Sequence, residues 1–217
     1  MNYLAHAIGL LNEPYVLAGA AVPDWLSVAD RRVRVRTKHA AAFVDDQDVR
    51  LRDVARGIVR HHRDDSWFHE TTAFSELSWR LTVLFRDALP GDEGFRPSFL
   101  GHIVVEMLLD AVLTAEHPGR LKAYYRALEE VDPSAVQAAV NRMAPRPTER
   151  LAELIPLFCR EAFLWDYADD GKLWRRLNQV MCRVGLPALP EGIRDLLPEA
   201  RSLVTSRAEE LLAAPLA

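Results

Sequence analysis

Apolar residues recur along most of the chain at intervals of three and four, the spacing that places them on one face of an α-helix. Proline and glycine separate these apolar segments, for example at Asp132-Pro133, where an N-cap aspartate precedes a proline in the first helical turn. The helices predicted in this way cover residues 2–12, 15–29, 48–69, 72–89, 97–116, 119–130, 133–143, 148–167, 170–184 and 192–213.

Strand patterns are almost absent, since only residues 31–37, RRVRVRT, alternate charged and β-branched side chains. We therefore predict an all-α protein, built as a compact multi-helix bundle with a single α-helical domain over residues 1–217. The candidate site described below falls within about residues 1–117. Residues 118–217 are expected to complete or cap the bundle.

The composition of the chain favours a globular protein. The chain of 217 residues is 49% hydrophobic and 27% charged, which is typical of a globular protein rather than a disordered one. Its net charge of −4 gives no nucleic-acid-binding signature. Cys159 and Cys182 form no Cys-x-x-Cys pair and suit a reducing compartment. The N-terminus lacks the basic region of a signal peptide, and no run approaches the roughly 20 apolar residues that span a bilayer. We expect a cytoplasmic protein without a transmembrane segment.

Residues 99–113, FLGHIVVEMLLDAVL, carry a stripe of ionisable side chains along an otherwise apolar helix. His102, Glu106 and Asp110 are four residues apart and therefore share one helical face. Burying an unpaired carboxylate is costly, and a bound metal ion would compensate for it. The alternative is an amphipathic helix with a thin solvated edge.

Residues 57–70, GIVRHHRDDSWFHE, repeat this spacing with His61, Asp65 and His69. By itself, His61 with Asp65 is equally typical of an ordinary ion pair on a helix. Further potential ligands precede this segment, although each has a plainer explanation. By itself, His6 is typical of a hydrogen-bonded histidine in a protein core. Asp24 alone is typical of a carboxylate in the first turn of a helix, and His39 alone of a surface residue. These potential ligands are His6, Asp24 and His39.

Taken in order, these residues resemble the ligand order of the zinc-dependent phospholipase C and single-strand nuclease superfamily, whose members are all-α phosphodiesterases with three zinc ions. The resemblance covers about the first 110 residues. The matching positions are His6, Pro23-Asp24, His39, His61-x-x-x-Asp65, His69 and His102-x-x-x-Glu106.

The resemblance implies a ligand set for each ion. Asp24, His39, His61 and Asp65 would hold one zinc. His69, His102 and Glu106 would hold a second, and His6 with Asp65 would hold a third. The secreted enzymes bind the third ion partly through a mature N-terminal tryptophan, whereas this sequence begins MNY, and His69 follows Asp65 more closely than in those enzymes. We therefore expect two or three divalent ions per chain, with Zn²⁺ as the first choice and Mn²⁺ or Fe as alternatives.

A weaker resemblance links residues 1–6, MNYLAH, with Asp24 and the Gly57-Ile58, His61 and Asp65 pattern, to the acyl carrier protein phosphodiesterases. Those bacterial cytoplasmic enzymes cleave phosphopantetheine from its carrier protein. Both families are metal-dependent phosphodiesterases, so both resemblances imply a hydrolase acting on phosphoester bonds. The substrate stays open between a lipid, a small phosphate-containing molecule and a phosphopantetheinyl carrier protein.

The implied chemistry is water activation by clustered ions, with Asp24, Asp65 and Glu106 as the catalytic carboxylates. Asp64 and Asp110 are predicted to orient the ligands or the nucleophile.

The basic segment at residues 31–38 either binds substrate phosphate or an acidic partner, or forms a solvated loop. Its cationic residues are Arg31, Arg32, Arg34, Arg36 and Lys38, of which Arg31, Arg34 and Arg36 are the candidate substrate-binding residues.

Two alternatives of another class remain. In the first, the chain is a non-catalytic helical interaction protein whose ionisable residues form buried ion pairs or hold one structural metal. In the second, it is a helical metalloprotein that carries out oxygen chemistry, and the lack of paired Glu-x-x-His motifs argues against this second alternative.

Overall fold

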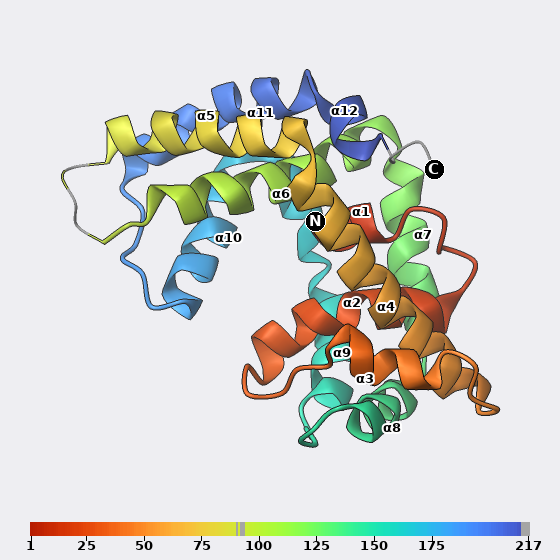
Figure 1. Cartoon of the computed structure of the whole chain (residues 1–217). Coiled ribbons are helices and arrows are strands. Elements are labelled where there is room, and N and C mark those ends of the chain that lie inside the picture. The colour runs from red at the N-terminus through yellow and green to blue at the C-terminus, as the bar shows by residue number, and fades with distance from the viewer. Residues whose placement is uncertain (90, 92–93, 214–217) are drawn as a thin grey trace. The chain divides into compact units, whose positions relative to one another are not determined.

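The computed structural model describes residues 1–89, 91 and 94–213. Helices are the only regular secondary structure in this part of the chain, which confirms the prediction of an all-α protein (Figure 1). The α-helices are α1 (Tyr3–His6), α2 (Pro14–Ala29), α3 (Thr37–Ala40), α4 (Val49–Glu70), α5 (Thr72–Ala88), α6 (Pro97–Glu116), α7 (Pro118–Glu129), α8 (Pro133–Met143), α9 (Leu151–Glu161), α10 (Asp170–Arg183), α11 (Leu197–Thr205) and α12 (Ala208–Leu212). The 3₁₀-helices are η1 (Ala41–Phe43), η2 (Phe163–Ala168) and η3 (Glu191–Leu196).

Local capping explains why several helices begin where the sequence predicted. The side chain of Thr71 accepts a hydrogen bond from the backbone N–H of Phe74 at the start of α5. Asp132 accepts one from Ser134 at 2.9 Å, and Pro133 occupies the first turn of α8. These caps satisfy backbone groups that the helix itself leaves without a partner.

The N-terminal helix is shorter than the prediction of residues 2–12. It ends at His6 and is followed by turns, with Gly9 in a left-handed conformation at φ 80°. The segment at residues 31–37 forms no strand in the described structure, although its alternation is real, because Val33 and Val35 are buried while Arg34 and Arg36 are exposed. Two buried valines anchor a loop here, with no neighbouring strand to complete a sheet.

Two of the longer predicted helices are interrupted. The helix predicted at residues 148–167 is divided at Ala162, which adopts a left-handed φ of 44° between α9 and η2. The helix predicted at residues 192–213 is divided into η3, α11 and α12. The short elements α3 and η1 were not predicted, because three or four residues are too few to show a helical period.

Contacts divide the chain into two compact units. Unit 1 comprises Met1, Tyr3–Ser66 and Gly119–Phe163. Unit 2 comprises Asn2, Trp67–Pro118 and Leu164–Ala217. Each unit takes residues from both sides of the predicted boundary near residue 117, and the single domain over residues 1–217 stays a prediction.

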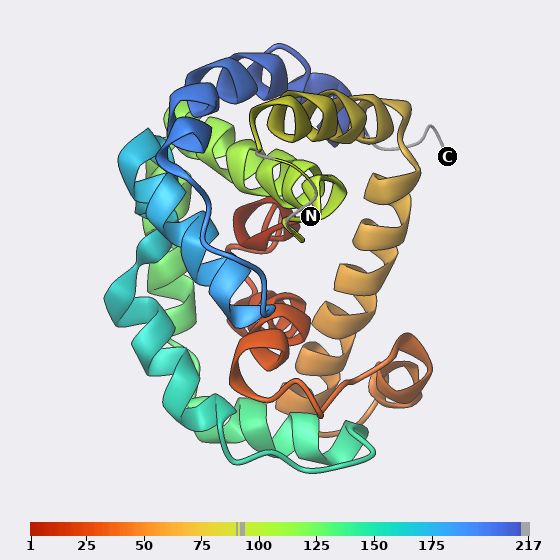
Figure 2. The same cartoon turned by 90° about the vertical axis from the view of Figure 1, so that its left-hand side faces the viewer.

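Two glycines allow α2 and α4 of unit 1 to approach closely. A Cβ atom on Gly57 would collide with the backbone carbonyl of Val16, and one on Gly19 would collide with that of Val54. Only glycine at both positions lets the two helix backbones touch. The packing of α2 continues against α8 and α9, which are green to turquoise in Figure 2.

Unit 2 is built around α6, which packs along α5 and under α11 (Figures 1 and 2). Gly101 makes this contact close, because a Cβ atom there would meet the backbone of Ser78 and Thr82 in α5. Nearly every side chain of α6 after His102 and Ile103 is buried as far as Thr114. Of the ionisable stripe predicted on this helix, Glu106 and Asp110 are therefore buried, whereas His102 at its start is partly exposed.

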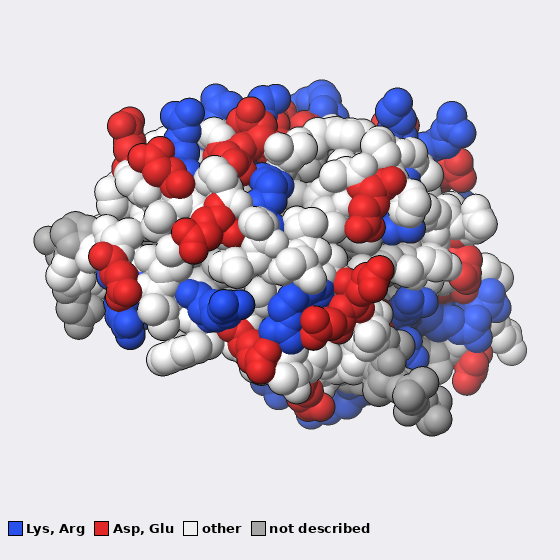
Figure 3. Space-filling model, turned by 90° about the horizontal axis from the view of Figure 1, so that it is seen from above, with Lys and Arg blue, Asp and Glu red and all other residues white. Residues whose placement is uncertain are grey.

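By length and composition alone, the helix α6 is long and apolar enough to cross a membrane, although His102, Glu106 and Asp110 interrupt its apolar residues. Within its most apolar window, 72% of the residues are buried inside the protein. A core helix surrounded by other helices meets the same criterion, so the length of α6 by itself is weak evidence for a membrane span. Basic and acidic side chains are interspersed on the face shown in Figure 3.

Candidate metal sites

The structure brings six of the eight predicted ligands together in two groups, one in each unit. Within each group, the potential ligand atoms all lie within 4.8 Å of one another. We call the first group, His6, His61 and Asp65, the His6 site. We call the second group, His69, His102 and Glu106, the Glu106 site.

The two imidazoles of the His6 site face the two oxygens of one carboxylate. Nε2 of His6 lies 3.2 Å from Oδ1 of Asp65, and Nε2 of His61 lies 3.4 Å from its Oδ2. The histidine rings stack with their centroids 4.1 Å apart. His61 and Asp65 come from consecutive turns of α4, while α1 supplies His6. Two elements that are distant in sequence therefore build this site.

A backbone carbonyl determines the orientation of His61. Its Nδ1 lies 2.8 Å from the carbonyl oxygen of Ala20 in α2, and because a carbonyl only accepts, Nδ1 carries the proton and donates it. The other nitrogen, Nε2, is thereby directed at Asp65. Metal-binding histidines commonly have this arrangement, in which the second ring N–H is held by a carbonyl or carboxylate. Gly57 lies one turn before His61, so the close α2–α4 crossing brings the Ala20 carbonyl within reach.

His6 is almost completely buried, with 2% of its side chain exposed. Burial lowers the pKa of His6 to about 4, so the imidazole is neutral at pH 7. Its Nε2 lies 3.2 Å from Oδ1 of Asp65, and this contact lowers the pKa of that carboxyl. Its Nδ1 is buried and makes no hydrogen bond with a described residue, which is unfavourable for a polar group.

Asp65 is ionised in the metal-free protein. Burial raises the pKa of its carboxyl, but the imidazoles of His6 and His61 and the positive amino group of Met1 outweigh burial and hold the pKa well below its usual range. The Met1 nitrogen lies 2.7 Å from Oδ1 of Asp65. The pKa of His61 is raised, because contact with Asp65 and the charge of Asp24 outweigh the opposing effect of burial.

In the Glu106 site, two histidines converge on a single carboxylate oxygen. Oε1 of Glu106 lies 3.0 Å from Nε2 of His69 and 3.2 Å from Nε2 of His102. Burial raises the pKa of Glu106, but hydrogen bonds from His102 and His69 hold it well below its usual range. Phe74 packs against both imidazoles, with ring centroids 4.8 and 4.9 Å away. Glu106 is thus an ionised, nearly buried carboxylate with two nitrogen atoms directed at it.

Asp24 and His39 lie in unit 1 but outside the two groups. The charge of Asp24 acts on His61, as its effect on the pKa of that residue shows. His39, in α3, has a buried Nδ1 that makes no hydrogen bond with a described residue. Their assignment as ligands of the first zinc stays a prediction.

The two carboxylates predicted to orient the site differ in their surroundings. Asp110 lies one turn after Glu106 on α6 and is buried. The carboxylate of Asp64 accepts hydrogen bonds from Arg60 at 3.1 Å and from Arg63 at 3.4 Å. Among the described residues, no contact between Asp64 and a candidate ligand supports its orienting role.

The basic segment is held to the protein by its backbone and its valines, so that its cations point outward. The carbonyl oxygen of Val35 accepts a hydrogen bond from Nε2 of His62, 2.8 Å away on α4. Arg32 pairs with Asp30 at 3.6 Å, and Arg31, Arg34, Arg36 and Lys38 are exposed. Arg150 adds a further cation from a distant part of unit 1, because it donates to the carbonyl of Ala29 at 3.0 Å.

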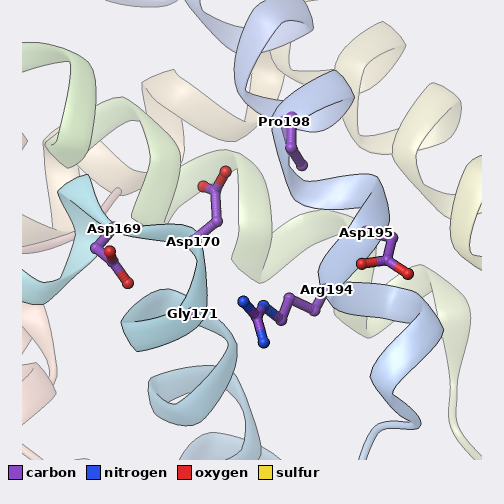
Figure 4. A pocket seen from close by; sticks show the side chains of 6 residues that line it. All are labelled: Asp169, Asp170, Gly171, Arg194, Asp195 and Pro198. Atoms are coloured by element: carbon purple, nitrogen blue, oxygen red, sulfur yellow. The ribbon is translucent and has the colours of Figure 1, made fainter.

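A separate open pocket of about 460 Å³ lies in unit 2, lined by none of the predicted site residues (Figure 4). Two of its carboxylates have structural roles, since Asp169 caps α10 and Asp170 pairs with Arg201. The remaining lining residues are Gly171, Arg194, Asp195 and Pro198.

Sequence reasoning missed the contacts that orient the candidate ligands. Phe74 gave no signal, because an aromatic residue at helical spacing looks like ordinary core. The Ala20 carbonyl could not have been identified, since every residue has one. The pairing of Met1 with Asp65 joins segments that are distant in sequence.

Comparison with known proteins leaves the family of the chain open, since no family model, curated protein or solved structure matches it.

Proposed function

We propose that this protein is a metal-dependent hydrolase acting on phosphoester bonds, of the phosphodiesterase class. The observation that carries the proposal is the presence of two groups of two imidazoles and one carboxylate, each with its ligand atoms within 4.8 Å. Either group alone could be a structural ion pair. Two such groups in a chain with seven histidines argue for selection of the arrangement.

The donor atoms fit zinc, which binds imidazole nitrogen and carboxylate oxygen, and three protein ligands leave a position open for water or substrate. Manganese or iron would accept the same donors. When bound, divalent ions lower the pKa of a coordinated water and neutralise the charge of a phosphoryl group.

The residues of the chain contribute orientation and charge. His61 is directed by the Ala20 carbonyl, so that Nε2 needs no rearrangement to serve as a ligand. Asp65 and Glu106 have pKa values well below their usual range, which keeps both carboxylates ionised and able to bind a cation at neutral pH. The role of Asp24 as a further metal ligand stays a prediction. The substrate also stays open between a lipid, a small molecule and a carrier protein.

One observation favours a second candidate function, a non-catalytic helical protein with buried ion pairs. Each carboxylate already has N–H partners without a metal: Asp65 has the Met1 amino group and His61, and Glu106 has His69 and His102. A protonated histidine can replace a metal ion in such an arrangement. The two candidates differ in metal content.

The test is the metal content of protein purified without chelator, measured by mass spectrometry for the wild type, Asp65→Asn and Glu106→Gln. Asp53→Asn on α4 and Glu116→Gln at the exposed end of α6 are matched controls. We expect at least two ions in the wild type and in the controls, fewer in each site variant, and hydrolysis of a chromogenic phosphodiester that falls with the metal. Wild-type protein that binds no ion above background would overturn the proposal and leave the ion-pair candidate.

A further inference from the structure

We infer that the two sites divide the work of the proposed hydrolase, an inference that rests on that proposed function. The His6 site holds a structural ion that is retained as part of folded unit 1. The Glu106 site holds an exchangeable ion, and it is there that an anionic phosphate oxygen of the substrate binds.

Exposure separates the two sites. In the His6 site, 2% of the His6 side chain and 4% of the His61 side chain are accessible to solvent. In the Glu106 site the corresponding fractions are 34% for His69 and 39% for His102. An ion bound by His69 and His102 would therefore lie close to solvent, because both of its histidine ligands are partly exposed. At the His6 site, Asp65 is the one ligand with appreciable exposure, at 29% of its side chain.

A backbone hydrogen bond to one of the histidines separates the sites further. Nδ1 of His61 is held by the Ala20 carbonyl, and this hydrogen bond depends on the glycine crossing of α2 and α4. His69 and His102 are instead oriented by the faces and edges of Phe74 and of each other, with the two imidazole centroids 4.8 Å apart. Aromatic contacts of this kind restrain a ring less strictly than a hydrogen bond to the backbone. Loss of one orienting hydrogen bond typically weakens metal binding by about 10- to 100-fold, so the His6 site is expected to hold its ion more tightly.

The more accessible site is also the one that suits substrate binding. Three ligands from the protein leave open positions on a four- or five-coordinate ion, and the exposed histidines place those positions toward solvent. A phosphate oxygen is a hard, anionic ligand that suits an imidazole- and carboxylate-bound divalent ion. The His6 site is less open, because its two stacked imidazoles are buried and the Met1 amino group lies against the one partly exposed ligand, Asp65.

The experiment uses Co²⁺, whose visible spectrum reports its ligands, with chelator-stripped full-length protein. Three proteins are compared: the wild type, His102→Ala and His61→Gln. Release of Co²⁺ to excess chelator is followed in time, and inorganic phosphate is then titrated into each loaded protein, with chloride at equal ionic strength as the control. Thermal unfolding of each protein is recorded with and without Co²⁺.

We expect biphasic release from the wild type, with the slow phase about 10- to 100-fold slower than the fast one. His102→Ala should lose the fast phase and the spectral response to phosphate, yet keep the slow phase and the stabilisation by Co²⁺. His61→Gln should show the converse. Because His102 is partly exposed, His102→Ala is expected to fold, and it tests the inference even if His61→Gln does not.

Two results would overturn the division of roles while leaving a metal-dependent hydrolase in place: release of both ions at one rate, or an unchanged phosphate response in His102→Ala. Wild-type protein that binds no Co²⁺ at all would instead contradict the proposed function itself.

Discussion

The His6 and Glu106 sites are assembled from the same parts but differ in depth. Each combines a His-x-x-x-carboxylate pair on one helix with a second histidine from another element, His6 in one case and His69 in the other. In unit 1 the pair lies on α4 where its backbone meets that of α2. In unit 2 it lies near the start of α6, where the two histidines stay partly exposed. The difference teaches that spacing along a helix creates the donor set, whereas packing determines whether solvent can reach it.

The largest expected effect comes from breaking the helix crossing that buries the His6 site. In Gly57→Ala the added methyl group collides with the Val16 carbonyl, and we expect a loss of about 3 kcal/mol in the free energy of unfolding, since overpacking a tight core costs this much. One bound ion should be lost with it. Urea unfolding and metal content measure the two effects.

Gly119→Ala in the same unit is the matched control, because a Cβ atom there meets nothing within 4 Å. If Gly57→Ala unfolded at the wild-type urea concentration and kept its full metal content, the crossing would not position His61.

An intermediate effect is expected from substitutions of His61 that keep a polar group at the position of only one of its two ring nitrogens. In His61→Asn the side-chain amide N–H can still donate to the Ala20 carbonyl, whereas in His61→Gln the amide reaches the position of Nε2. In metal-free protein we expect His61→Gln to be less stable than His61→Asn by about 1–2 kcal/mol, because it leaves a buried carbonyl without its donor. Equal stability of the two variants in urea would show that the Ala20 hydrogen bond does not hold the ring.

The smallest effect is a pH dependence of the Glu106 site in metal-free protein. The pKa of Glu106 in the folded state lies well below its usual range, so its carboxylate stabilises the fold above the ordinary glutamate pKa of about 4.3. That contribution is lost as the pH falls toward the folded-state pKa.

The free energy of unfolding, measured in urea between pH 6 and pH 3, should therefore fall more steeply with decreasing pH for the wild type than for Glu106→Gln. Glu116→Gln, at the exposed end of the same helix, should follow the wild type. A wild-type curve that runs parallel to that of Glu106→Gln would show that the two histidines do not stabilise the ionised carboxylate.

Much of the fold could be predicted from the sequence because helical periodicity is a local property. The predicted boundaries of α5 and α6 differ from the observed ones by at most one residue. The errors fall where local patterns are weak or where tertiary contacts end a helix, as at Ala162 with its left-handed backbone. The turns after His6 are another such place.

The sequence by itself determined which ionisable residues share a helical face, since residues four apart on a helix are neighbours whatever surrounds them. It thereby specified His61 with Asp65, and His102 with Glu106. The spacing did not place His6 beside the first pair or His69 beside the second, although the resemblance implied both. The tertiary structure brings these residues together and leaves Asp24 and His39 outside both groups. It also decided that one site is buried and the other accessible. These outcomes depend on contacts between segments far apart in the chain, such as the α2–α4 crossing at Gly19 and Gly57, and a local pattern contains no information about them.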